Sequence, residues 1–254
     1  MQNPIILPAF SDNFIYLLPY QKDKALAVDP GQSPPVLTAL DAHRLTLTHV
    51  LITHHHYDHT AAVSDLKKHT PCRVIAPDAR IPGVDLITDE VPTIKIGQLH
   101  ITILHTPGHT ETGVCCYIPP AASVPPLLFT GDTLFAAGCG RVLETDMKTM
   151  YNSLQKLAAL PPDTLIYPGH DYTEENCLFA LTILPHDPDF QARLAQTQQA
   201  IRDSLPTVPS TIAEEKRSNI FLRANDPQVK AALKMPAAPD HETFAELRNR
   251  KDAF

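Results

Sequence analysis

The sequence has little glycine and no excess of positive charge. Only 9 of its 254 residues are glycine, which excludes a collagen-like repeat. Its 28 acidic residues outnumber the 21 lysines and arginines, so the formal net charge is −7. We therefore expect no nucleic-acid partner, because general nucleic-acid binders carry a basic face. At 43% hydrophobic residues, the chain is too apolar for a disordered protein and can bury a sizeable core.

Cysteine and long apolar runs are also scarce. The five cysteines are an odd number without a framework spacing, so we expect no disulfide scaffold. No apolar run approaches the roughly 18 residues that a membrane-spanning helix needs. The N-terminal segment lacks the basic start of a secretory signal peptide. These absences predict a cytoplasmic globular protein without a membrane partner, and a monomer is the default expectation.

The texture of the chain changes near residue 172. Short β-branched apolar runs dominate before it and predict strands of a buried sheet, whereas helical periodicity dominates after it. We expect an α/β domain over residues 1–172 and a smaller helical domain over residues 173–254. The paired prolines, such as Pro34-Pro35, are expected in stiff loops. Strands are expected at 14–18, 25–28, 45–53, 73–76, 99–104, 113–118, 127–130 and 164–167.

Capping residues predict where several helices begin. Asp146 is an expected N-cap for a helix over 147–160, and a second helix is expected over 61–68. In the C-terminal part, Asp187 and Asp226 each precede a proline at the first helical position, Thr211 with Glu214 fits a capping box, and 242–251 forms the last helix.

Residues 53–60, Thr-His-His-His-Tyr-Asp-His-Thr, connect a predicted strand to a predicted helix. Side chains alternate along extended chain, so His54 and His56 point the same way and His55 points oppositely. Asp58 and His59 follow the turn and can face a second point nearby. Such nitrogen and oxygen donors suit one or two divalent metal ions.

Three further strand ends repeat one pattern, a glycine followed at once by histidine or aspartate. Glycine allows the backbone to turn sharply, and strand ends converge where α/β folds hold their sites. One tetrahedral zinc takes four donors, so seven donors with one shared carboxylate predict two metal ions about 3.5–4 Å apart. Asp132 is the better bridging candidate; zinc is expected, with iron or manganese as alternatives. The seven donors are His54, His56, Asp58, His59, His109, Asp132 and His170.

The signature His54-His55-His56-Tyr57-Asp58-His59 resembles that of the metallo-β-lactamase superfamily. Within it, the chain resembles the glyoxalase II (hydroxyacylglutathione hydrolase) family over almost its whole length. The supporting stretches are 106–110, 130–135, 138–141, 168–181, 218–223 and 244–252. The resemblance implies a metallo-β-lactamase-like αβ/βα four-layer sandwich followed by a smaller C-terminal helical domain.

The resemblance also implies the roles of individual residues. One metal takes His54, His56 and His109, the other takes Asp58, His59 and His170, and Asp132 bridges. Asp58 and Asp132 are then the catalytic residues, together with a metal-activated hydroxide. Glutathione is held by Arg141, Tyr172, Arg248 and Lys251, although the chain departs from many members at Leu143, where they carry an aromatic residue.

The implied reaction is hydrolysis of S-D-lactoylglutathione and related 2-hydroxyacyl-glutathione thioesters to D-lactate, or the corresponding acid, and glutathione. This is the second step of methylglyoxal detoxification. Two alternatives stay open. A glutathione persulfide dioxygenase would need a single iron, against which the seven donors argue. A binding protein with purely structural metals would favour cysteine ligands, and here the donors are all histidine and aspartate.

Overall fold

The computed structural model describes residues 3–88, 91–121 and 124–254; residues 1–2, at the start of the segment without signal-peptide features, lie outside this part. The chain divides into two compact units. The N-terminal unit comprises Met1–His105 and Thr112–Gly131, and the C-terminal unit comprises Thr106–Glu111 and Asp132–Phe254. The segment Thr106–Glu111 packs with the later residues because Ser153 Oγ donates to the Pro107 carbonyl at 2.6 Å.

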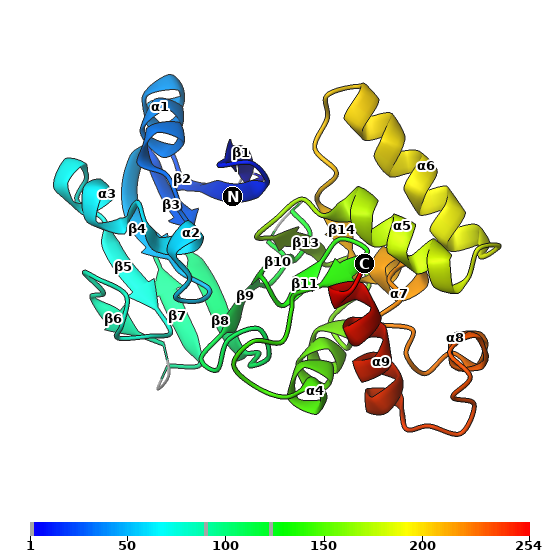
Figure 1. Ribbon diagram of the computed structural model, residues 1–254. Coiled ribbons are helices and arrows are strands. Elements are labelled where there is room, and N and C mark those ends of the chain that lie inside the picture. Colours follow the sequence, from blue (N-terminus) through cyan, green and yellow to red (C-terminus); the bar gives the residue numbers. More distant parts are fainter. Residues whose placement is uncertain (1–2, 89–90, 122–123) are drawn as a thin grey trace. The chain divides into compact units, whose positions relative to one another are not determined.

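The first sheet of the N-terminal unit has six strands in sequential order (Figure 1). The strands β1 to β3 pair antiparallel, and β3 to β6 pair parallel, so the sheet is mixed. Parallel neighbours need crossovers, and α1 and α3 provide two of them. The elements are β1 (Ile5–Ala9), β2 (Asn13–Gln21), β3 (Lys24–Val28), α1 (Ser33–His43), β4 (Thr46–Leu51), α2 (Tyr57–Thr60), α3 (Val63–His69), β5 (Arg73–Ala76) and β6 (Leu86–Ile87).

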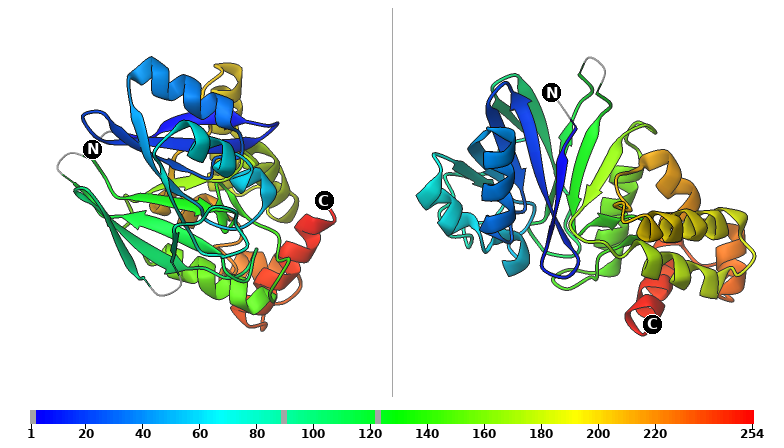
Figure 2. Two further views of the ribbon diagram at one scale, coloured as in Figure 1. Left: turned by 90° about the vertical axis from the view of Figure 1, so that its left-hand side faces the viewer. Right: turned by 90° about the horizontal axis from the view of Figure 1, so that it is seen from above.

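This sheet is buried on both faces. Alternate residues of β2, Ile15 and Leu17, join a core that includes Val36 of α1 and Leu66 of α3. Figure 2 shows these helices on one face of the sheet and an antiparallel meander on the other. Tyr16, pointing to that second face, packs against Phe129 with ring centroids 5.5 Å apart. The meander consists of β7 (Thr93–Ile96), β8 (Leu99–His105), β9 (Val114–Ile118) and β10 (Leu127–Gly131).

The C-terminal unit is mainly helical, with two small antiparallel strand pairs, β11–β12 and β13–β14. Its core is aromatic. Phe221 stacks on Phe179 with ring centroids 5.9 Å apart, and the ring centroids of Phe244 in α9 and Tyr151 in α4 are also 5.9 Å apart. The elements are β11 (Leu134–Phe135), β12 (Gly138–Cys139), α4 (Met147–Ala158), β13 (Leu165–Pro168), α5 (Thr173–Ile183), α6 (Pro188–Arg202), β14 (Ser210–Thr211), α7 (Ile212–Ser218), α8 (Pro227–Ala232) and α9 (Asp240–Asp252).

The predicted helix caps are confirmed. Asp146 accepts a hydrogen bond from Thr149 N at the start of α4, and Asp187, Asp226 and Thr211 cap α6, α8 and α7. The expectation that Pro34-Pro35 lies in a loop is wrong. Both prolines lie in the first turn of α1, where a fixed φ suits the helix and no backbone donor is needed.

The expected strands are all present within a few residues of their predicted ends. Among the residues that the structure describes, no helix combines the length and apolar character that crossing a membrane requires.

Candidate metal centre

In the N-terminal unit, His54 follows β4, and the hydrogen bond made by one of its ring nitrogens determines which nitrogen is free to bind a metal ion. Thr53 Oγ1 donates to Asp29 Oδ2 at 2.6 Å, so this hydroxyl accepts from His54 Nδ1, which lies 3.0 Å away. Nε2 of His54 is therefore the nitrogen with a lone pair for a metal ion. It lies 3.1 Å from Nδ1 of His56, which places two ligand nitrogens side by side.

Asp29 orients His59 in the same way. Its Oδ2 lies 3.1 Å from His59 Nδ1, and its Oδ1 accepts from the backbone of Thr53 at 2.7 Å. A hydrogen bond from Nδ1 leaves Nε2 of His59 as the ligand nitrogen. This Nε2 lies 3.4 Å from Oδ2 of Asp58, whose carboxylate is held by Asn13 Nδ2 at 2.8 Å.

The C-terminal unit contains the remaining three predicted donors, and His109 and His170 both lie close to Asp132. Its Oδ2 lies 3.4 Å from Nε2 of His109 and 3.4 Å from Nε2 of His170. His109 donates from Nδ1 to the carbonyl of Arg141 at 2.8 Å, which again turns Nε2 toward the carboxylate. Asp132, His109 and His170 are all less than a tenth exposed.

A glycine allows this close arrangement. A Cβ on Gly140 would lie 1.9 Å from the carbonyl oxygen of Asp132 and 3.3 Å from Nδ1 of His109. Any larger residue would push the 138–141 segment away from both ligands. His170 is fixed from another side, because its ring stacks on Tyr172 with centroids 5.0 Å apart.

These separations fit a divalent metal ion. Two ligands at zinc bond lengths of about 2.0–2.2 Å lie about 3.4 Å apart at a tetrahedral angle. The Asp132 contacts in one unit and the Asp58–His59 contact in the other have this spacing. The donors are imidazoles and carboxylates, which zinc, iron and manganese all accept. The chain thus carries histidine–aspartate clusters consistent with a binuclear site.

The predicted substrate residues all lie in the C-terminal unit. Arg141 is exposed, and Tyr172 covers His170. Arg248 is buried and donates to the Cys139 carbonyl at 2.8 Å. Lys251 forms an ion pair with Glu175, and its ammonium lies 5.1 Å from the ring centroid of Phe254.

Sequence reasoning missed Asp29 and Asn13, which contact metal-ligand candidates. A signal for Asp29 existed, since it directly follows the apolar strand β3, as Asp132 follows Gly131 at the end of β10. His55 is turned toward Arg80, with its Nδ1 3.3 Å from Nη2. Burial raises the pKa of Cys139 to about 11, so this thiol is protonated at neutral pH and is no nucleophile.

Two family models divide the chain between them. Residues 10–170 match the metallo-β-lactamase superfamily, and residues 171–254 match the family described as hydroxyacylglutathione hydrolase C-terminus. Among curated relatives, the hydroxyacylglutathione hydrolase of Rhodopseudomonas palustris (strain BisB18) is 42% identical over 251 residues, covering 97% of both chains. That of Methylococcus capsulatus is 40% identical over 252 residues, covering 98% of this chain and 97% of its own.

Solved structures share the fold. ETHE1 from Myxococcus xanthus superimposes with a TM-score of 0.67 at 25% identity, covering 99% of both chains. The B3 metallo-β-lactamase BLEG-1 gives 0.65 at 22% identity, covering 87% of this chain and 99% of its own. TTHA1623, solved in a di-iron-bound form, gives 0.59 at 24% identity, covering 87% of this chain and all (100%) of its own. The expected metallo-β-lactamase-like fold with a helical C-terminal region is confirmed, and the chain belongs to the hydroxyacylglutathione hydrolase (glyoxalase II) family.

Proposed function

We propose that this protein hydrolyses S-D-lactoylglutathione and related 2-hydroxyacyl-glutathione thioesters. The observation that carries the proposal is the match of residues 171–254 to the C-terminal region of hydroxyacylglutathione hydrolases, together with full-length relatives at about 42% identity. The reaction breaks the carbonyl carbon–sulfur bond. Water supplies a hydroxyl to the acyl group and a proton to the glutathione thiolate, giving D-lactate and glutathione.

We assign two divalent ions to the seven donors, with zinc as the expected metal. His54, His56 and His109 would hold one ion, Asp58, His59 and His170 the other, and Asp132 both. Bound divalent ions lower the pKa of water toward neutrality and stabilise an oxyanion. The chain's own contribution is orientation. Asp29 fixes the ring nitrogens of His54 and His59, Asn13 holds Asp58, and the Arg141 carbonyl fixes His109.

We assign glutathione recognition to Arg141, Tyr172, Arg248 and Lys251. Glutathione carries two carboxylates, which guanidinium and ammonium groups recognise well. The contact between Tyr172 and His170 supports this assignment, because it joins a substrate residue to a metal ligand. The departing thiolate is a tolerable leaving group, so no dedicated general acid is required.

We also propose a division into two domains, a monomeric state and a cytoplasmic location. The family models meet at residues 170 and 171, which supports a catalytic domain over 1–172 and a substrate-binding domain over 173–254. All five cysteines are free, buried thiols, which supports a reducing cytoplasm. We propose that the active species is the monomer, because each predicted site residue is supplied by one chain.

The direct test is hydrolysis of S-D-lactoylglutathione by the purified, zinc-loaded protein. The reaction is measured through the loss of the thioester absorbance and the formation of D-lactate. The matched control substrate is the D-lactoyl thioester of N-acetylcysteamine, which lacks both glutathione carboxylates. We expect kcat/KM for the glutathione thioester to be at least 100-fold higher.

Equal rates with the two thioesters would remove the glutathione assignment, and no metal-dependent turnover of either would remove the hydrolase assignment. Oxygen uptake with glutathione persulfide, at about one iron per chain, would favour the dioxygenase instead.

A further inference from the structure

The backbone of the hairpin formed by β11 and β12, residues 134–139, is held by side chains from the helical part of the C-terminal unit. Asn219, the C-cap residue of α7, donates from Nδ2 to the carbonyls of Phe135 at 3.3 Å and Gly138 at 2.9 Å. Asn176 of α5 donates to the Ala136 carbonyl at 3.1 Å. With Arg248 on the carbonyl of Cys139, three helical elements hold one short hairpin.

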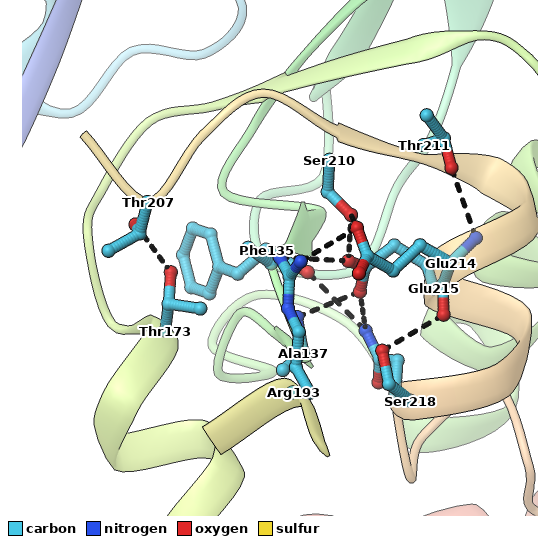
Figure 3. A network of polar contacts seen from close by, with 12 residues as sticks. Phe135, Ala137, Thr173, Arg193, Thr207, Ser210, Thr211, Glu214, Glu215 and Ser218 are labelled. Carbon is cyan, nitrogen blue, oxygen red and sulfur yellow. Dashed lines mark hydrogen bonds and ion pairs between the residues drawn. The ribbon is translucent and has the colours of Figure 1, made fainter. Parts of the chain in front are cut away.

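Glu215 of α7 lies at the centre of these contacts and is fully buried (0% exposed) (Figure 3). Its Oε2 accepts from the backbone of Ala137 at 2.8 Å and from Asn219 at 2.9 Å. Its Oε1 accepts from Ser210 Oγ at 2.5 Å. Ala137 sits at the hairpin tip with φ 57°, a left-handed conformation that an alanine adopts only when its surroundings hold it there.

A carboxylate in this position is costly for stability. Burial raises the pKa of Glu215 above its ordinary value, and the opposing effects of Arg193 and the surrounding hydrogen bonds do not reverse this shift. Arg193 Nη2 lies 3.8 Å from Oε1. Well-packed apolar residues usually stabilise a fold as much as a buried ion pair does. A buried carboxylate with three hydrogen-bond donors therefore indicates that the positions of these donors matter.

The geometry in question is that of the metal ligands of this unit. The hairpin lies between Asp132 and Gly140, and a Cβ on Gly140 would clash with the Asp132 carbonyl and lie 3.3 Å from Nδ1 of His109. On the other side, Ser210 of β14 pairs with Ile166 of β13, the strand that leads into His170. Glu215 therefore joins the hairpin that follows Asp132 to the strand pair that leads into His170, and His109 is linked to the far end of the hairpin by its hydrogen bond to the Arg141 carbonyl.

We propose that Glu215 is a positioning residue for these three metal ligands. By tying the hairpin tip to β14, it keeps Nε2 of His109 and Nε2 of His170 at metal-binding distance from Asp132. The inference rests on the proposed metal site, but not on the identity of the thioester. It assigns the helical C-terminal region a second task besides substrate recognition, namely holding part of the metal centre.

The test compares Glu215→Gln with wild type and with Glu214→Gln in the full-length protein. Glutamine keeps the size of the side chain and one acceptor, but it loses the charge and the second acceptor. Glu214 pairs with the same Arg193 at 2.7 Å and accepts from the same Ser210 hydroxyl at 3.2 Å, but these contacts lie outside the hairpin, which makes it the matched control. Zinc affinity is measured by competition with a chromophoric chelator, and ligand geometry from the visible spectrum of the cobalt(II)-substituted protein.

For Glu215→Gln we expect both zinc ions to bind at least tenfold more weakly, because the three ligands serve both, with a shifted cobalt spectrum, a lower kcat and a KM within twofold of wild type. Glu214→Gln should match wild type in all four readouts. A folded Glu215→Gln variant with wild-type zinc affinity and cobalt spectrum would overturn the proposal.

If Glu215→Gln does not fold, Ser210→Ala decides, because it removes one hydrogen bond from the Glu215 carboxylate. It also removes the contact with Glu214, and the Glu214→Gln variant controls for that loss. About threefold weaker zinc binding supports the proposal, and unchanged binding overturns it. The zinc and cobalt readouts need no substrate. A wild-type protein that binds zinc without hydrolysing thioesters would therefore refute the proposed function separately.

Discussion

At the scale of single residues, the candidate metal ligands are oriented by groups outside the seven predicted donors. Asp29 is the main one, because its carboxylate fixes Nδ1 of His59 directly and Nδ1 of His54 through Thr53. In Asp29→Asn, the amide nitrogen would face one of these donors. We expect zinc affinity or kcat to fall about 10–100-fold, the usual effect of losing such a partner.

Zinc competition and steady-state kinetics measure this effect. Asp23→Asn, an exposed aspartate in the turn between β2 and β3, serves as the control and should match wild type. An Asp29→Asn variant with two tightly bound zinc ions and wild-type kcat would contradict the orienting role.

Lys251 of the predicted glutathione clamp already has an anionic partner, as Arg248 does in Asp252. The side chain of Lys251 is only 7% exposed, and its ammonium pairs with Glu175, which is 58% exposed. A substrate carboxylate would have to share this ammonium with Glu175. We therefore expect Glu175→Gln to lower KM for glutathione thioesters about two- to fivefold, with kcat unchanged, and the effect to shrink in high salt.

The neighbouring Glu174 offers a matched control, because its carboxylate contacts Gln198 instead. Glu174→Gln should leave KM unchanged. The same KM for Glu175→Gln and wild type at low ionic strength would show that Lys251 does not bind the substrate.

At the scale of elements, most of the longer strands could be predicted because each is an apolar run bounded by turn residues, but β1 and β7 were not predicted. The two-residue strands could not be predicted. The hairpin of β11 and β12 is held by Asn219, which is more than 80 residues away in sequence. The α1 helix was hidden by Pro34-Pro35, because prolines mark loops and first helical turns alike.

The turn after β5 yields a prediction about pH. Hydrogen bonds from the Arg80 side chain lower the pKa of Asp78 to about 2, and Thr112 adds a further bond at 3.1 Å. Since this pKa lies below the ordinary value, Asp78 stabilises the folded state fully above about pH 4 and loses this effect as the pH falls toward 2. We expect Asp78→Asn to lower the free energy of unfolding by about 2 kcal/mol at pH 7.

Urea unfolding of the metal-free wild type and variant at several pH values measures the difference, and chelation removes any contribution from metal loss. The difference should narrow steadily below pH 4. A difference that stays constant from pH 7 to pH 2.5 would show that packing, and not the charge of Asp78, stabilises this turn.

At the scale of the whole molecule, the sequence identified the candidate ligands better than their supports. All seven predicted donors lie in the histidine motif or directly after a strand, and such local patterns are visible in a single sequence. The supports are not local. Arg248 reaches the carbonyl of Cys139 across 109 positions, and Glu215 reaches Ala137 across 78. The assignment of Thr106–Glu111 to the C-terminal unit likewise depends on packing with later residues such as Ser153.

Each unit has its own apolar core, and the ligands are held by hydrogen bonds within the protein. Folding should therefore survive metal removal, unlike that of small proteins stabilised by a structural zinc. After dialysis against a strong chelator, we expect an unchanged far-ultraviolet circular dichroism spectrum, a cooperative thermal transition lowered by several degrees, and thioesterase activity below about 1% of the starting value.

Adding zinc back should restore activity at a stoichiometry of two ions per chain, as measured by elemental analysis. Full activity at one ion per chain would show that a single metal suffices. A catalytic centre on a preformed scaffold leaves that scaffold folded when the metal ions are removed. Loss of the circular dichroism signal on chelation would therefore assign the metals a structural role.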